Sequence, residues 1–131
     1  GYQPLELQIM KMEKKIEAGA RFFQTQAVYD IRSFENFMKE TSRFNVPVLA
    51  GIVLLKSAGM AKFMNENVAG VSVPENYIKM MASADKKDRS RVSIQIAAEL
   101  IRGMKDMCSG IHMMPLGWDR HVPAVLEEAG F

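Results

Sequence analysis

Amphipathic segments alternate along the chain with short, densely apolar runs. Three of these runs predict β-strands, at residues 21–28, 48–55 and 110–116. The middle run, Val-Leu-Ala-Gly-Ile-Val-Leu-Leu, is apolar at nearly every position, which is typical of a strand buried on both faces of a parallel sheet. Gly51 within this run indicates that another group approaches the backbone closely.

Apolar residues spaced three and four positions apart predict helices between and around the strands. Asp30 is the expected N-cap of the helix that follows the first strand. Ser72 and Glu75 have the spacing of a capping box, which predicts that a later helix begins there. The predicted helices cover residues 4–18, from 30 to about 41, 57–67, 72–84, 85–107 and 122–129.

This order of elements predicts a single α/β domain whose parallel strands are joined by right-handed crossovers. Three strands leave unpaired edges, and a complete eight-stranded barrel needs about 250 residues. The chain has 131 residues, about half of that number. Periodicity therefore leaves two architectures open, half of a barrel or a smaller open sheet.

Composition narrows the class of protein. Hydrophobic residues make up 48% of the chain and charged residues 24%, which is typical of a folded globular domain. The formal charge of +2 is too small to favour a nucleic-acid partner. The longest apolar run, 46–55, is shorter than the roughly 20 residues of a membrane helix, and no signal peptide is recognisable, so no membrane partner is expected.

The single cysteine, Cys108, excludes an internal disulfide framework and fits a cytoplasmic location. Together with His112 and His121 it provides too few ligands, too irregularly spaced, for a zinc site, so no metal site is predicted. The eleven methionines are interpreted as core residues that fill irregular gaps.

Two stretches carry a specific family resemblance. Residues 14–20, Lys-Lys-Ile-Glu-Ala-Gly-Ala, and 23–30, Phe-Gln-Thr-Gln-Ala-Val-Tyr-Asp, resemble the helix end and the sixth barrel strand of methylenetetrahydrofolate reductases. Residues 48–52 look like the seventh strand of that family and 110–114 like the eighth. The region 67–74 and the last helix also match, so the resemblance covers nearly the whole chain in the family's order.

The resemblance implies that residues 1–131 form the C-terminal half of a (β/α)8 TIM barrel, about strands six to eight with their flanking helices. In this family a flavin, FAD or alternatively FMN, binds at the C-terminal ends of the strands. NAD(P)H or another electron-donor subunit reduces the flavin, which passes a hydride to 5,10-methylenetetrahydrofolate and yields 5-methyltetrahydrofolate.

The resemblance also places the family's general acid in the missing N-terminal half of the barrel. No catalytic residue is therefore assigned in this chain, and we expect the isolated chain to be inactive. Its exposed strand edges predict an oligomer. An alternative class of function is a non-catalytic α/β interaction module that associates through these edges.

Five positions correspond to ligand-binding residues of the family. Gln26 matches the glutamine that binds the folate substrate, and an amide offers donors and an acceptor without charge. Lys15 matches the lysine that reaches the flavin phosphates. Lys11 and Lys14 occupy positions of other flavin contacts, and Gln8 matches a position that contacts the ribityl or ribose portion. The competing interpretations are a strand-end amide and a solvated helix face.

Two positions depart from the family pattern. Met60 stands where some relatives have a substrate-binding glutamine, and Trp118 stands where they have an arginine. The ending 114–118, Met-Pro-Leu-Gly-Trp, resembles reductases of acetogenic anaerobes, which often work beside iron–sulfur partner subunits. These departures leave the identity of the electron donor open.

Overall fold

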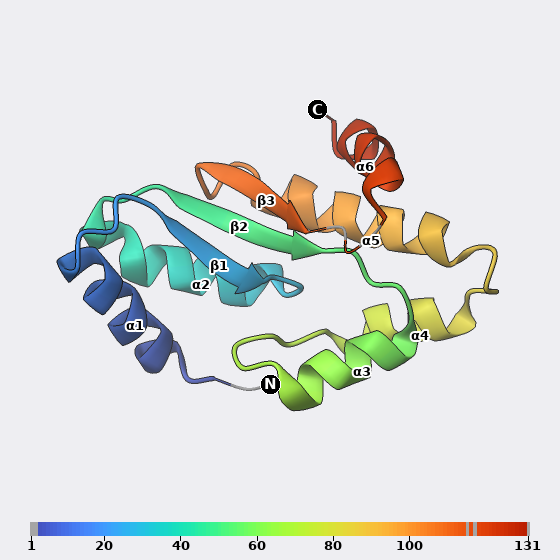
Figure 1. Ribbon diagram of the computed structural model, residues 1–131, viewed down its shortest axis with the longest axis horizontal. Helices are drawn as coiled ribbons and strands as arrows, with labels where there is room; N and C mark the ends of the chain where they lie inside the picture. The colour runs from blue at the N-terminus through green and yellow to red at the C-terminus, as the bar shows by residue number, and fades with distance from the viewer. Residues whose placement is uncertain (1–2, 115, 117, 131) are drawn as a thin grey trace.

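Three parallel strands form one sheet in the computed structural model, which describes residues 3–114, 116 and 118–130 (Figure 1). The strands are β1 (Phe23–Ala27), β2 (Val48–Val53) and β3 (Gly110–Met114), and they lie side by side in sequence order. Sequential parallel neighbours joined by helices are the arrangement of consecutive strands in a (β/α)8 barrel. The predicted α/β class with parallel strands is confirmed.

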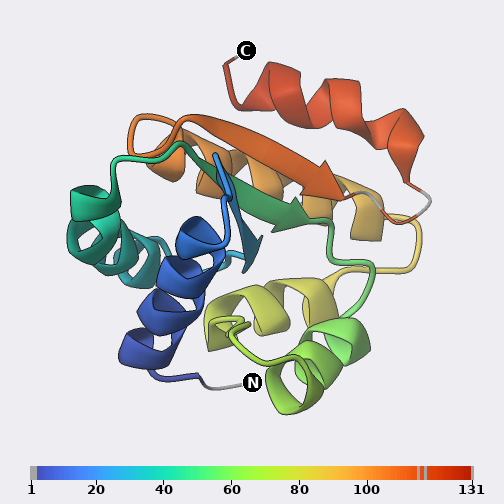
Figure 2. The ribbon, with the colours of Figure 1, turned by 60° about the vertical axis from the view of Figure 1, so that its left-hand side comes forward.

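Helices surround this sheet on one face and at one end. In Figures 1 and 2, α2 and α5 lie behind the sheet, α6 packs on α5 and α1 lies beside α2. The paired helices α3 and α4 lie near the C-terminal ends of the strands. The bounds are α1 Leu5–Glu17, α2 Ile31–Thr41, α3 Ala58–Asn67, α4 Glu75–Ser83, α5 Arg89–Met104 and α6 Val122–Glu128, with 3-10 turns at Ser42–Phe44 and Asp119–His121.

β2 lies at the centre of the core and is buried along almost its whole length. Ala50 and Ile52 are fully buried, and so is Leu54 just beyond the strand. Near-continuous apolar sequence is what a central parallel strand requires, because both of its faces are covered. Four methionines also lie in the interior, consistent with their interpretation as flexible core residues: Met12, Met64, Met81 and Met104.

Two predicted helix starts are wrong. The capping box at Ser72 does not form, and Pro74 is the N-cap of α4. The reason is that both side-chain groups of Asn65 bond to Val73, with Nδ2 donating to the carbonyl at 3.1 Å and Oδ1 accepting from the N–H at 2.6 Å. Residues 85–88 form a turn, and α5 begins only at Arg89.

The close approach predicted at Gly51 is confirmed. A Cβ atom at this position would lie 2.8 Å from the carbonyl oxygen of Thr25 and 3.1 Å from that of Gln26. Both contacts are with backbone atoms of β1, which cannot move aside without disturbing the strand pair. Glycine is therefore required for β1 and β2 to pack at this distance.

We expect Gly51→Ala to lower the free energy of unfolding by about 1–3 kcal/mol, the usual cost of overpacking. Gly59→Ala is the matched control, because the nearest atom to its added Cβ is Ser57 Oγ at 3.7 Å. Alanine also has the higher helix propensity, by up to about 1 kcal/mol, so the control should be neutral or stabilised. Urea unfolding measures both; equal stability of the two variants would contradict the packing argument.

Within the described residues, β1 and β3 each pair along one edge only. Unpaired N–H and C=O groups at a sheet edge favour association with another chain. We therefore expect the isolated chain to self-associate reversibly, with a sedimentation coefficient that rises with protein concentration. A single monomeric species at all concentrations would contradict this expectation.

Candidate functional site

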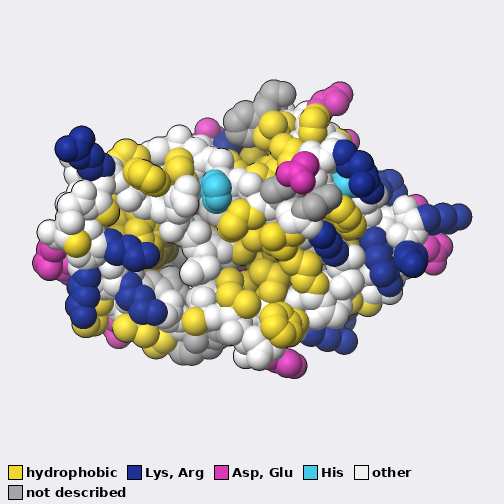
Figure 3. All heavy atoms as spheres, in the orientation of Figure 1, with side chains coloured by type: hydrophobic (Ala, Val, Ile, Leu, Met, Phe, Trp, Pro, Cys, Tyr) yellow, Lys and Arg dark blue, Asp and Glu magenta, His cyan; other side chains and the backbone are white. Residues whose placement is uncertain are grey.

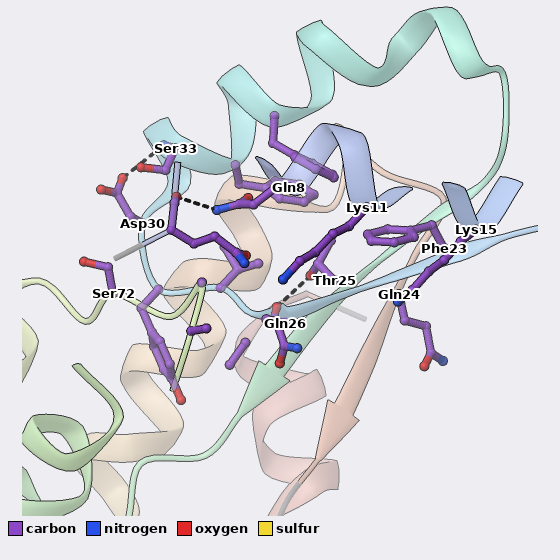
Figure 4. Close-up of a pocket in the computed structure, with 18 residues that line it drawn as sticks. Gln8, Lys11, Lys15, Phe23, Gln24, Thr25, Gln26, Asp30, Ser33 and Ser72 are labelled. Atoms are coloured by element: carbon purple, nitrogen blue, oxygen red, sulfur yellow. Dashed lines mark hydrogen bonds between the residues drawn. The ribbon is translucent and has the colours of Figure 1, made fainter. Parts of the chain in front are cut away.

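A pocket of about 230 Å³ lies between α1, β1 and the loop that joins α3 to α4 (Figure 4). Its walls come from α1, from the whole of β1 and the residues that follow it, and from residues 69, 70 and 72. In a (β/α)8 barrel, ligands bind at the C-terminal ends of the strands. The pocket extends to that end of β1.

Four of the five predicted binding residues line this pocket. Gln8, Lys11 and Lys15 reach it from α1, and Gln26 reaches it from β1 (Figure 4). Lys14 is exposed and is not among the residues that line the pocket, so its assignment stays a prediction. The structure thus brings together side chains that are eighteen positions apart in the sequence, from Gln8 to Gln26.

The orientation of α1 follows from its one buried residue. Met12 is fully buried and packs with Phe37 and Val48 in a small core cluster. Positions 8, 11 and 15 are three and four residues apart, so they share one stripe of the helix surface. Burial of Met12 fixes the rotation of the helix, and this stripe then faces the pocket.

Each side chain of this stripe has a defined neighbour. The Lys15 ammonium lies 5.3 Å from the centroid of the Phe23 ring, within the range of a cation–π contact. Gln8 Nε2 donates a hydrogen bond of 3.0 Å to the carbonyl of Gln3. Lys11 extends from α1 toward the end of β1 near Thr25 and Gln26 (Figure 4). The stripe therefore offers two cations and an amide to the pocket.

Gln26 is presented by an irregularity in β1. The register shifts between Gln24 and Ala27, where β1 carries one more residue than β2. Thr25 Oγ1 accepts a 2.9 Å hydrogen bond from Gly51 N–H and donates one of 2.7 Å to the carbonyl of Gln26. The Gln26 side chain remains exposed, so its amide is available to a ligand.

Two residues just after β1 fix the inner wall of the pocket. The Asp30 carboxylate accepts hydrogen bonds from the N–H groups of Arg32 and Ser33, at 3.0 and 3.2 Å, which confirms the predicted N-cap of α2. The Tyr29 hydroxyl donates a 2.7 Å hydrogen bond to the carbonyl of Val53. Burial raises the pKa of Tyr29 far above its ordinary value, so this hydroxyl stays protonated.

Sequence reasoning missed several pocket residues. Gln24 lines the pocket and lies two positions before Gln26 on β1. Residues two positions apart point to the same face of a strand. That spacing was a readable signal. Gly70 and Ser72 reach the pocket from the α3–α4 loop, and nothing in the local sequence predicts that this loop folds back onto β1.

A second group of side chains lies beyond the ends of β2 and β3. Lys56 Nζ donates a hydrogen bond to the carbonyl of Leu116 and lies 5.8 Å from the centroid of the Trp118 ring. The sulfur of Met60 accepts from Lys56 N–H at 3.4 Å. The two positions that depart from the family pattern, Met60 and Trp118, thus both contact Lys56.

The described residues contain no group of three His, Cys, Asp or Glu side chains that could hold a metal ion. No helix among them has the length and apolar character needed to cross a bilayer.

Comparison with known proteins gives concordant matches. The model of the family described as methylenetetrahydrofolate reductase matches residues 2–130. Methylenetetrahydrofolate reductase 2 of Schizosaccharomyces pombe is 28% identical over 129 residues, covering 89% of this chain and 20% of the relative. Methylenetetrahydrofolate reductase 1 of the same yeast is 24% identical over 141 residues, covering 99% of this chain and 23% of the relative.

Among solved structures, the fold resembles an uncharacterized protein from Clostridium thermocellum that binds two copies of 5-methyl-5,6,7,8-tetrahydrofolic acid. The TM-score is 0.54 at 19% sequence identity, over 92% of this chain and 46% of that chain. At this identity the likeness shows the fold alone. The chain spans about a fifth of the length of the curated relatives it matches.

The hydrogen bond of Tyr29 leads to a prediction with a pH signature. Tyr29→Phe should lower the free energy of unfolding by about 0.5–1.5 kcal/mol near neutral pH, because the bond to Val53 is lost. The folded protein keeps the Tyr29 proton that the unfolded chain releases near pH 10.0, the ordinary value. The stability contributed by Tyr29 is therefore present below that pH and is lost as pH rises above it.

Thermal unfolding across the alkaline range measures this difference. Above pH 10 the parent should lose stability more steeply than Tyr29→Phe, so the gap between them narrows or reverses. Parallel curves at all pH values would show that Tyr29 titrates alike in the folded and unfolded chains.

Proposed function

The chain belongs to the methylenetetrahydrofolate reductase family, and from that membership we propose that it forms part of a flavin-dependent oxidoreductase that reduces 5,10-methylenetetrahydrofolate to 5-methyltetrahydrofolate. The observation that carries the proposal is the pocket in which Gln26 lies with Gln8, Lys11 and Lys15. These residues correspond to the family's ligand contacts and come from two separate elements. They meet at the C-terminal end of a barrel strand, which is the position at which this fold binds ligands.

The side chains of the pocket fit a flavin nucleotide. Lys11 and Lys15 would hold its phosphates, because an ammonium on a flexible stem is a suitable phosphate ligand. Gln8 would contact the hydroxyl groups of the ribityl or ribose portion. When bound, the flavin supplies the hydride chemistry, and the protein binds and orients both ligands. FAD is the proposed cofactor, with FMN as the alternative.

Gln26 is proposed to bind the folate. Its amide presents two N–H donors and a carbonyl acceptor, which suit the mixed donor and acceptor edge of a pterin ring. Because the amide is neutral and does not titrate, it orients the substrate and does not transfer a proton. We assign no catalytic acid or base to the described residues of the pocket.

The proposed reductase also needs further barrel strands and an electron donor. The chain spans about a fifth of its curated relatives, and the sheet edges of β1 and β3 are open to further strands. The barrel would be completed by these strands, and electrons would come from NAD(P)H or a partner subunit. A cytoplasmic location belongs to the same proposal, because the free thiol of Cys108 fits a reducing compartment.

The open edges also suit the alternative class of function, a non-catalytic interaction module. Ligand binding separates the two. The chain, completed by the strands it lacks, should bind FAD or FMN and 5-methyltetrahydrofolate in calorimetric titrations. A completed barrel that binds none of these ligands would favour the interaction module.

Gln26→Ala and Lys15→Ala should give opposite defects in the completed barrel. Loss of the Gln26 amide should leave flavin bound and lower kcat/KM for the folate by about twofold to about 150-fold, which corresponds to about 0.5–3 kcal/mol. Loss of the Lys15 ammonium should weaken flavin retention and leave turnover near normal at saturating flavin. Stopped-flow reduction and reoxidation of the flavin measure the two half-reactions separately.

Lys79→Ala provides the matched control. Lys79 is an exposed lysine of α4 outside the pocket, and its removal changes the net charge as Lys15→Ala does. Flavin retention and turnover should both match the parent. If Gln26→Ala also matches the parent in both half-reactions, the assignment of Gln26 to the folate is wrong.

A further inference from the structure

The irregularity in β1 leaves a gap in the strand pairing that a side chain fills. Gln24 is paired with Leu49 and Ala27 with Gly51, so three steps along β1 correspond to two along β2. Two residues of β1, Thr25 and Gln26, thus stand opposite one residue of β2. Such a β-bulge interrupts the regular ladder and redirects nearby side chains, and bulges are common beside active sites.

The Thr25 hydroxyl bridges the interrupted ladder. Gly51 N–H donates a hydrogen bond to Thr25 Oγ1 at 2.9 Å. The same hydroxyl donates to the Gln26 carbonyl at 2.7 Å. One side chain therefore bonds both to a backbone donor of β2 and to a backbone acceptor of β1, and so links the two strands at the bulge.

Gln26 depends on this bridge more than an ordinary strand residue would. Its own amide makes no hydrogen bond to any described residue, and its side chain is exposed. The direction in which the side chain leaves the strand is set by the backbone of Gln26, whose carbonyl accepts the hydrogen bond from Thr25. Because Gly51 has no Cβ, which would lie 2.8 Å from the Thr25 carbonyl, the bulge can lie directly against β2.

We propose that Thr25 is a positioning residue, whose hydroxyl holds the bulge in the shape that aims the Gln26 amide at the folate. This inference rests on the proposed function of Gln26 and adds a residue that does not itself contact the ligand. Threonine suits the role because its branched side chain restricts χ1, so the hydroxyl is held between the two backbone groups at a small entropic cost.

A double-mutant cycle tests whether Thr25 acts through Gln26. The variants are Thr25→Val, which keeps the shape and removes the hydroxyl, Gln26→Ala, and the two combined. Binding of 5-methyltetrahydrofolate to the flavin-loaded, completed barrel is measured by calorimetry. Thr25→Val should weaken binding by about two- to tenfold, the range expected for one misplaced uncharged hydrogen bond.

The combined variant carries the decisive result. If Thr25 only positions Gln26, it should bind no more weakly than Gln26→Ala alone, because there is no amide left to aim. If the loss of binding in the combined variant equals the product of the losses in the two single variants, Thr25 acts independently of Gln26. That result would overturn the inference and leave the proposed function intact. A Gln26→Ala variant that binds like the parent would overturn both.

Thr25→Ser is the conservative control, because it keeps the hydroxyl and loses only the methyl group. It should bind within about twofold of the parent, and its Gly51 amide should exchange with solvent as slowly as in the parent. In Thr25→Val that amide should exchange faster. If Thr25→Ser binds as weakly as Thr25→Val, the hydroxyl is not what positions Gln26. Should Thr25→Val fail to fold, Thr25→Ala replaces it in the same cycle.

Discussion

The close approach of β1 to β2 at Gly51 is the constraint on which the candidate site depends. Only a residue without a Cβ lets the β1 backbone come within 2.8 Å of that position, and the bulge at Thr25 and Gln26 occupies the space gained. The chain then resumes regular pairing at Ala27, and the Tyr29 hydroxyl reaches the carbonyl of Val53. One glycine on the central strand thus determines where the pocket wall of the neighbouring strand lies.

A second constraint, independent of the first, comes from Met12. This residue is fully buried against Phe37 and Val48, and burying a side chain of its size contributes about 1.5–3 kcal/mol. The remaining surface of α1 can carry charge. Figure 3 shows basic side chains over this helix and hydrophobic side chains nearer the middle of the same view. The pocket forms between the face of α1 that is oriented by the burial of Met12 and the bulge of β1 that Gly51 accommodates.

These two constraints explain what the sequence could and could not predict. The apolar run of β2 and its glycine were readable, because burial on both faces and a close contact each leave a local mark. The convergence of Gln8, Lys11, Lys15 and Gln26 followed from the family resemblance. The bulge was not readable, because the residues of β1 still alternate between more and less buried positions, as they would in a regular strand. The capping box at Ser72 failed for a related reason, since Asn65 acts on Val73 from another helix.

The described residues of the pocket suit the binding and orientation of ligands, and in the proposed reductase the strands that complete the barrel would supply the other groups. Asp30 is the one acidic side chain among the described residues that line the pocket, and its carboxylate already accepts two N–H groups of α2. The other polar groups are ammonium ions, amides and hydroxyls, which bind and orient ligands at neutral pH. The pocket volume of about 230 Å³ is also below the roughly 300–1,000 Å³ typical of complete ligand sites. In the proposed reductase, a proton donor and further walls would come from the strands that complete the barrel, and we therefore expect activity only from the completed barrel.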